Sequence, residues 1–374
     1  MTLARMDQLA ALARAPIAFE RNETWRVYAG GKLLRELRGQ PDPQDNHFPE
    51  DWIASMTRAD NPPRDGRPAL EGISVIRGTD VPFSLLVELF PREIVGEAHA
   101  AAFGPRTQVL AKFLDSAVRL PIQAHPDDDY ARRYFNASVG KTEAWIVVAT
   151  RVVDGVEPYI LLDLHPDVDA AGFRRLVEEQ DLEGQVACLN RIPVLPGEAY
   201  LVAARTLHAI GSGVFMIEVQ QPSDLVVHTE RRVVDIEISE QAAHMGLGWD
   251  TALDILDYTG RTVQETTAHA KLQPQEVLRL SGGTVQQVIS YRDTPFFASR
   301  RIQVQGELKL TNQHFYAGAV VSGAGSLACS RAEMQLRPGD TFLVPNSVRA
   351  HTYRATDCGL QIITADPPAI ACPR

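Results

Sequence analysis

The sequence predicts a mainly β protein built from two jelly-roll barrels with additional helices. Two blocks of the chain, from about residue 105 to 236 and from 284 to 366, contain short runs rich in Val, Ile and Leu between Gly and Pro turns. The blocks also share a repeat: Pro196-Gly-Glu-Ala-Tyr-Leu-Val is matched by Pro338-Gly-Asp-Thr-Phe-Leu-Val, and a histidine follows each segment. A single period of about 142 residues indicates a duplicated domain rather than a solenoid.

The N-terminal part of the chain is predicted to contain helices and loops. Residues 3–15 place apolar side chains on one helical face, and residues 92–104 are also predicted as a helix, with Gly104 as its C-cap. Between them, residues 40–70 are rich in Pro, Asp, Asn and Arg, which is typical of loops and turns.

One helical insert, residues 167–190, interrupts the first block of strands. A mostly helical or irregular stretch then separates the two blocks. The predicted division of the chain is an N-terminal segment that joins the first barrel (1–104), the first barrel (105–237), a connecting segment (238–283) and the second barrel (284–374).

Composition excludes several classes of protein. At 374 residues, with 45% hydrophobic and 22% charged residues, the chain resembles an ordinary soluble globular protein of two or more domains. Its formal net charge of −10 argues against nucleic acid or an anionic membrane as a partner. There is no apolar run long enough to span a membrane, and charges interrupt the apolar residues of the N-terminus, so no signal peptide is predicted. The scattered Cys188, Cys329, Cys358 and Cys372 are predicted to be reduced thiols of a cytoplasmic protein.

Four polar residues have the spacing of a metal site. Gln123 and His125 are two apart in a predicted strand, so their side chains share one face. Glu143 lies in a second predicted strand, and His208 follows a third through a short loop. An amide oxygen, two imidazoles and a carboxylate form a mixed N/O shell for one divalent ion with an open position.

Four motifs in order carry a resemblance to a known family. They are Gln123-Ala-His-Pro-Asp, Gly140-Lys-Thr-Glu-Ala-Trp, Leu207-His-Ala-Ile-Gly and Ile217-Glu-Val-Gln-Gln-Pro-Ser-Asp, with a weaker match at Pro49-Glu-Asp-Trp. Order and spacing agree over roughly residues 20 to 366. The chain resembles the type I phosphomannose isomerases, which are zinc-dependent members of the cupin superfamily.

The resemblance implies a ligand set and a reaction. Zinc, or another divalent metal, is expected at Gln123, His125, Glu143 and His208. The expected reaction is the interconversion of an aldose and a ketose phosphate, with mannose 6-phosphate and fructose 6-phosphate as the default pair. The second barrel is expected to carry no metal site, because its histidines have no accompanying Glu or Gln at matching spacing.

Two lysines are the candidates for proton transfer. Isomerisation moves a proton between C1 and C2 through a cis-enediol, and it needs a base, a polarised carbonyl and a grip on the phosphate. The metal supplies Lewis acidity, and a desolvated lysine near a cation can act as the base when its pKa is lowered. Lys141, two residues from Glu143, is the first candidate, and Lys112 is the second.

The residues that differ from the family pattern lie at positions where the resemblance implies contact with the substrate. His228 stands where the family has an arginine implicated in substrate handling, and Arg205 stands where a small residue is usual. Because histidine lacks the bidentate fork of arginine, we expect a different grip on the phosphate. Arg205 is the first candidate for that grip, with Arg231 or Arg232 as alternatives. Glu218 alternates with apolar neighbours on its strand and faces either the cavity or solvent.

Three alternatives stay open beside the default reading. The chain can be an isomerase or epimerase of a different sugar that uses the same metal and lysines. It can also be a metal-bearing cupin that binds a sugar without turnover, although the presence of Lys112 and Lys141 argues against this. A cupin dioxygenase is disfavoured, since such sites use several histidines rather than Gln and Glu.

Overall fold

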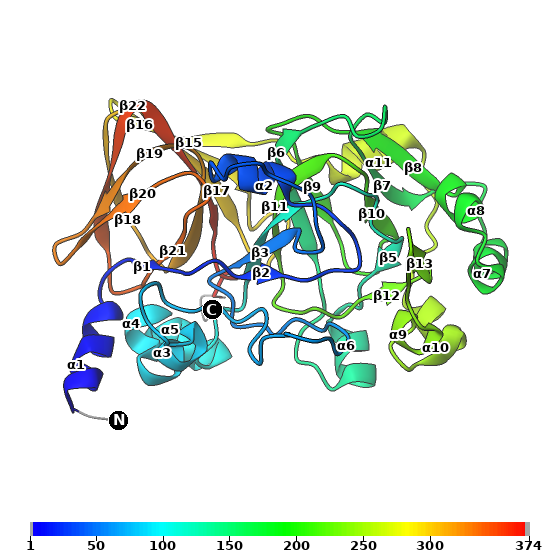
Figure 1. Ribbon diagram of the computed structural model, residues 1–374, viewed down its shortest axis with the longest axis horizontal. Helices are drawn as coiled ribbons and strands as arrows, with labels where there is room; N and C mark the ends of the chain where they lie inside the picture. The colour runs from blue at the N-terminus through cyan, green and yellow to red at the C-terminus, as the bar shows by residue number, and fades with distance from the viewer. Residues whose placement is uncertain (1–2, 371–374) are drawn as a thin grey trace.

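The computed structural model describes residues 3–370, which form two β-rich parts lying side by side along the longest axis of the molecule (Figure 1). Most of the regular structure is strand, so the prediction of a mainly β fold is confirmed. Helices lie mainly around the lower edge and one end of the molecule in this view (Figure 1).

The first part contains the four predicted metal ligands and consists of two sheets. Apolar side chains from both sheets meet in one core that includes Trp145, Ile160, Ile210 and Met216. The six-stranded sheet has the order β2 (Glu23–Thr24), β3 (Glu50–Ile53), β4 (Leu110–Asp115), β11 (Val214–Gln220), β6 (Glu143–Thr150) and β9 (Ala199–Val202). The five-stranded sheet has the order β12 (Val227–His228), β5 (Gln123–Ala124), β10 (His208–Ile210), β7 (Tyr159–Leu164) and β8 (Leu189–Pro193). A separate hairpin pairs β13 (Arg232–Val233) with β14 (Ile236–Glu237).

The second part is one nine-stranded sheet around its own core, which includes Tyr316, Phe342 and Tyr353. A further apolar cluster joins the two parts, because it contains Phe113 and Ile217 from the first and Leu343 from the second. Along the main path, the strands are β1 (Ile17–Ala18), β21 (Thr341–Val344), β19 (Tyr316–Ala328), β22 (Ala350–Ala365), β17 (Ser299–Val304), β16 (Gly283–Ile289) and β15 (Gln275–Leu280). Off this path, β18 (Glu307–Thr311) pairs with β22, and β20 (Glu333–Leu336) pairs with β19.

The N-terminal segment contributes strands to both parts. In the second part, β1 pairs with β21, so that Ile17 lies opposite Leu343. In the first part, β2 and β3 extend the sheet beyond β4. Within residues 3–370, the strand pairing of neither part closes into a ring, so the two closed barrels and the domain boundaries stay predictions.

Two of the predicted helices are each divided into a pair of shorter ones. Residues 92–104 fold as α4 (Pro91–Ile94) and α5 (Glu97–Phe103), which Gly96 separates with φ of 90°, a conformation that glycine adopts at low cost. Gly104 is the C-cap, as predicted. The insert folds as α7 (Ala170–Glu179) and α8 (Leu182–Ala187), and an aspartate side chain caps the N-terminus of each. The remaining helices are α1 (Leu3–Leu12), α2 (Lys32–Leu37), α3 (Phe83–Leu89), α6 (Asp128–Phe135), α9 (Glu240–Ala243), α10 (Gly248–Asp254) and α11 (Val263–Ala270).

Within the described residues, no helix combines the length and the apolar character needed to cross a membrane. Cys188, Cys329 and Cys358 are free thiols, in agreement with the prediction. Cys372 lies outside the described residues.

Candidate metal centre and cavity

Three of the predicted ligands form a buried cluster. One ligand atom each from His125, Glu143 and His208 lies within 4.8 Å of the other two. Glu143 begins β6 in the six-stranded sheet, whereas His125 directly follows β5 and His208 begins β10 in the five-stranded sheet. The cluster therefore lies between the two sheets and depends on both of them.

A close backbone contact brings β6 to the segment that carries His125. The amide N–H of Lys141 donates to the carbonyl oxygen of Pro126 over 2.9 Å. Gly140 leaves no space for a side chain, since a Cβ there would lie 2.4 Å from the same oxygen. A glycine at this position is thus required for Glu143 to approach His125.

Both imidazoles are oriented by backbone carbonyls. The Nδ1–H group of His125 donates to Leu225 over 2.8 Å, and that of His208 donates to Thr206 over 2.8 Å. A carbonyl can only accept, so each Nε2 is left with its lone pair directed at the cluster. Burial lowers the pKa of both rings, which keeps them neutral and able to bind a metal.

The carboxylate of Glu143 joins the two rings. Its Oε2 lies 3.2 Å from His125 Nε2, and its Oε1 lies 3.4 Å from His208 Nε2. Trp145 orients the group by donating its indole N–H to Oε1 over 3.0 Å. Burial raises the pKa of Glu143, but the positive charge of Lys141 lowers it more, to about 2, so the group is anionic.

Gln123 is the fourth predicted ligand and reaches the same cluster. It lies opposite His208 in the pairing of β5 with β10, and its amide is 3.3 Å from His208 Nε2. The assignment of amide oxygen and nitrogen can be exchanged by rotation, so either atom can face the cluster. The structure therefore brings together all four residues that the sequence singled out.

The cluster has the features of a cation site. Two neutral imidazoles, a carboxylate and an amide match the donor set of a divalent transition metal. The Lys141 ammonium lies 2.8 Å from Glu143 Oε2. The same ammonium is 3.0 Å from His125 Nε2, so a positive charge already occupies the position between these two groups. These residues fit one divalent ion.

Three further ionic side chains belong to the same region: Lys112 on β4, Glu218 on the neighbouring β11, and Lys141 just before β6. Glu218 faces the cavity, and its two oxygens lie 3.4 Å from Lys112 and 3.5 Å from Lys141. All three side chains are buried. Burial and the nearby Glu143 raise the pKa of Glu218. Although burial lowers the pKa of Lys141, Glu143 and Glu218 outweigh it and raise that pKa, which is opposite to the lowering expected for a base.

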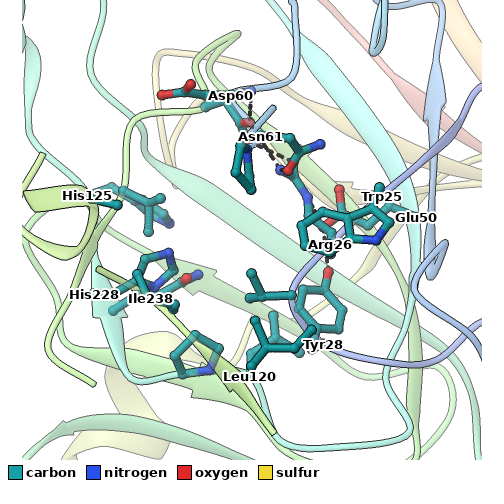
Figure 2. A pocket seen from close by; sticks show the side chains of 18 of the residues that line it. Trp25, Arg26, Tyr28, Glu50, Asp60, Asn61, Leu120, His125, His228 and Ile238 are labelled. Atoms are coloured by element: carbon teal, nitrogen blue, oxygen red, sulfur yellow. Dashed lines mark hydrogen bonds and ion pairs between the residues drawn. The ribbon is translucent and has the colours of Figure 1, made fainter. Parts of the chain in front are cut away.

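A second ionic cluster, which sequence reasoning did not assign, lies across the cavity from His125 and His228 (Figure 2). Arg26 donates to Asp224 over 2.9 and 3.2 Å and to Glu50 over 3.0 Å. Arg26 belongs to no recognised motif. The only feature of the sequence that could have pointed to it is that it is the one charged residue in the run Trp25-Arg-Val-Tyr28. Burial raises the pKa of Glu50, but Arg26 and Lys112 lower it to about 2.

These groups line a cavity of about 690 Å³, which is within the range typical of small-molecule sites. Its wall includes three of the four predicted ligands, Gln123, His125 and Glu143, together with both lysines. His208 lies behind them, where its Nε2 faces Glu143. The metal cluster is thus open to a chamber that can hold a small molecule.

The predicted substrate residues separate into two groups. His228 lines the cavity, and its pKa falls to about 4, mainly because of burial and the charge of Arg26. Arg205 does not line it: its Nε donates to Ile255 over 2.9 Å, and its guanidinium lies over Tyr130. The two alternatives also lie outside the wall, with Arg231 paired to Glu240 and Arg232 exposed.

The sequence is similar to those of known mannose-6-phosphate isomerases. A family profile described as "Mannose-6-phosphate isomerase, cupin domain" matches residues 287–355, within the second part. Mannose-6-phosphate isomerase of Streptococcus mutans is 28% identical over 298 residues, which are 79% of this chain and 84% of that protein.

Solved structures share the fold over nearly the whole chain. The mannose 6-phosphate isomerase of Bacillus subtilis superposes with a TM-score of 0.70 at 22% identity, covering 94% of this chain and 99% of that chain. A mannose 6-phosphate isomerase bound with zinc and yttrium has a TM-score of 0.67 at 15% identity, covering 95% of this chain and 100% of that chain. The chain therefore shares the overall fold of those structures.

Proposed function

We propose that this chain, which belongs to the type I phosphomannose isomerase family of the cupin superfamily, is a metal-dependent aldose–ketose isomerase. The reaction we propose is the interconversion of a sugar and its 2-keto isomer through a cis-enediol. Mannose 6-phosphate and fructose 6-phosphate are the reference pair, because the relatives carry the name of that reaction.

The observation that carries the proposal is the position of the metal cluster. His125 and Glu143 face a cavity of about 690 Å³, and buried Lys141 lies 3.0 Å from the first and 2.8 Å from the second. Lys112, also buried, lines the same cavity. A bound sugar can thus meet a Lewis acid and proton-transfer groups at once, which is what isomerisation at C1 and C2 requires.

We assign the metal to His125, Glu143 and His208, with the amide oxygen of Gln123 as the fourth ligand. Zinc is the first candidate, since two imidazoles and a carboxylate suit it and one of the similar structures contains it. When bound, such an ion supplies Lewis acidity toward the oxygens of the sugar.

Proton transfer is assigned to the lysines with the help of Glu218. A lysine can accept a proton only when it is neutral, yet both ammonium groups are held by carboxylates here. Glu218 lies 3.4 Å from Lys112 and 3.5 Å from Lys141, so it is placed to take the proton from either one. Lys141 remains the first candidate for the base, and Lys112 is the second or stabilises the negative charge of the enediolate.

We also propose that the second part has no metal site. Its His351, the counterpart of His208 in the repeat, is 2.8 Å from the hydroxyl of Tyr316. Tyr316 is in turn 2.6 Å from Tyr353. His351 therefore has a hydrogen-bond partner in place of a metal ion. This supports residues 105–237 as the catalytic domain.

An NMR assay tests the function. The zinc-loaded protein is incubated in deuterated water with mannose 6-phosphate, fructose 6-phosphate and a panel of free aldoses. We expect formation of the corresponding ketose or aldose with deuterium at C1 or C2. A C2 epimer without a ketose would favour the epimerase alternative. Binding without any turnover would favour the non-catalytic cupin and reject the proposal.

A further inference from the structure

We propose that the cavity selects an uncharged sugar over its phosphate ester, an inference that rests on the proposed isomerase function. It concerns the substrate's charge and leaves the isomerisation chemistry unchanged. The argument comes from the ionic groups of the cavity wall and from the partners that each of them already has.

The wall is rich in carboxylates. Among the described residues, six acidic side chains line the cavity, against three lysine or arginine side chains. A divalent ion at the metal cluster would bring this count close to neutrality, with no excess of positive charge to attract an anion. The acidic residues are Glu50, Asp60, Glu143, Glu218, Asp224 and Glu237.

Arg26 is the only arginine on the described wall, and four of its five N–H donors are already used. It binds Asp224 through two hydrogen bonds and Glu50 through a third. A fourth reaches the side-chain oxygen of Asn61 over 3.2 Å. To bind a phosphate through two hydrogen bonds, Arg26 would have to weaken its pairing with Asp224 or Glu50, whose side chains are only 11% and 4% exposed, which is unfavourable.

The two lysines are engaged in the same way. Lys112 lies 3.4 Å from Glu218 and 3.8 Å from Glu50, and its ammonium also rests over the ring of Trp52. Lys141 lies 2.8 Å from Glu143 and 3.5 Å from Glu218. Both belong to the reaction centre, so neither is free for a group at the far end of a sugar.

The stretch of the wall between residues 236 and 245 provides no replacement. Ile236, Glu237 and Ile238 of the β14 region line it, together with Ala242 and Met245. The only charged residue among them is Glu237, which is exposed and acidic, and the polar Ser239 of the same stretch caps α9. Arg231 and Arg232 lie on the same hairpin but outside the cavity wall.

An uncharged sugar matches this wall better than its phosphate does. A phosphate monoester carries about −1.5 to −2 charges at pH 7, which would meet carboxylates instead of free cations. Sugar hydroxyls are donors, and donation to an ionised carboxylate is among the stronger hydrogen bonds. Trp25 and Tyr28, also on the wall, offer rings against which an apolar sugar face can pack.

The direct test compares substrates that differ only in the phosphate. Using the full-length zinc-loaded protein, kcat/KM is measured for mannose and mannose 6-phosphate, and for further aldoses with their terminal phosphates. We expect the free sugar of the best pair to be preferred by roughly tenfold or more. Preference for the phosphate would overturn this inference and leave the isomerase function intact. Turnover of neither member of any pair would reject both.

Two variants test the electrostatic explanation. His228→Arg and Glu237→Lys each add positive charge to the cavity wall, and Glu237 is exposed, so the second variant should fold normally. We expect each to raise the ratio of kcat/KM for phosphate over free sugar by about tenfold. His269→Arg, on the exposed side of α11, is the control and should leave the ratio unchanged. An unchanged ratio in Glu237→Lys would contradict the explanation.

Discussion

Arg26 and Asp224 form a bidentate ion pair of 2.9 and 3.2 Å between segments that are 198 residues apart in the chain. The pair connects the N-terminal segment to the loop that follows β11 and carries the backbone carbonyl of Leu225. That carbonyl holds the ring of His125. A contact outside the metal cluster thus helps to determine the shape of the cavity and the orientation of one candidate ligand.

Loss of Arg26 should destabilise the protein. Arg26→Met leaves Asp224 and Glu50 without their main cation, in positions where their side chains are only 11% and 4% exposed. We expect the free energy of unfolding to fall by about 3–5 kcal/mol, as is typical when one partner of a buried pair is removed. Urea denaturation measures it, with Arg232→Met at an exposed position as the control. A loss equal to that of the control would mean that the pair contributes nothing.

The histidine ligands should determine the metal content. His125→Ala and His208→Ala each remove one imidazole from a cluster of three ligand atoms within 4.8 Å, so bound zinc should fall from about one ion per chain to well below that. Elemental analysis after dialysis measures the zinc. His269→Ala, which changes an exposed histidine, should keep the wild-type content. Wild-type content in both cluster variants would place the metal elsewhere.

Lys112 should matter for both catalysis and stability, and the two effects can be separated. Lys112→Met should lower kcat by roughly 10²–10⁴-fold and also lower the melting temperature, because Glu218 loses one of its two cations. Adding Glu218→Gln should restore part of the melting temperature without restoring turnover. If the double variant regained wild-type kcat, Lys112 would have no part in the chemistry.

Lys141 is tested through rate and metal content together. Lys141→Met removes the ammonium that lies 2.8 Å from Glu143, so zinc content should be kept or increased while turnover is lost. The expected loss in kcat is roughly 10²–10⁴-fold. Retained turnover at normal zinc content would exclude Lys141 as a proton-transfer group.

Asp115 should give the stability a recognisable pH dependence. Burial raises its pKa to about 6, despite a hydrogen bond from the amide of Leu34. The folded state therefore binds the proton of the Asp115 carboxyl group more tightly than the unfolded state does. The stabilisation that results is fully present below about pH 4 and is lost as the pH rises through about 6. Asp115→Asn should accordingly gain stability relative to wild type between pH 4 and 7. A difference in melting temperature that stays constant over this range would contradict the shifted pKa.

The metal cluster was predictable because short-range patterns determine it. Gln123 and His125 belong to one strand end, and the motif around Glu143 includes the Gly140 that its close approach requires. The mainly β class followed from strand-like runs between turns in the same way. Such features depend on a few neighbouring residues, and a sequence displays them directly.

The charged contacts around the cavity depend on pairing between strands that are distant in the chain, so they were harder to predict from the sequence. Glu218 lies beside Lys112 because β11 pairs with β4 in one register, which no local pattern specifies. Arg26 meets Asp224 through tertiary packing alone. Arg205 precedes His208 by three residues and was expected at the cavity mouth, yet its guanidinium is held by Ile255 and stacks on Tyr130. Its role in phosphate binding stays a prediction without support from this position.

The pairing of β1 with β21 limits how much of the protein can fold while it is still being synthesised. A ribosome synthesises Ile17 more than three hundred residues before Leu343, its partner in the sheet. Asn346 and Ser347 also donate backbone hydrogen bonds to Ile94 and Glu93 at α4. The segment around Ile17 can pair early with residues 75–77, but its edge toward β21 stays open until almost all of the protein has been synthesised. A chain truncated before residue 341 would lack the partner strand of Ile17 and Ala18, so we expect it to aggregate or be degraded rather than yield a free catalytic part.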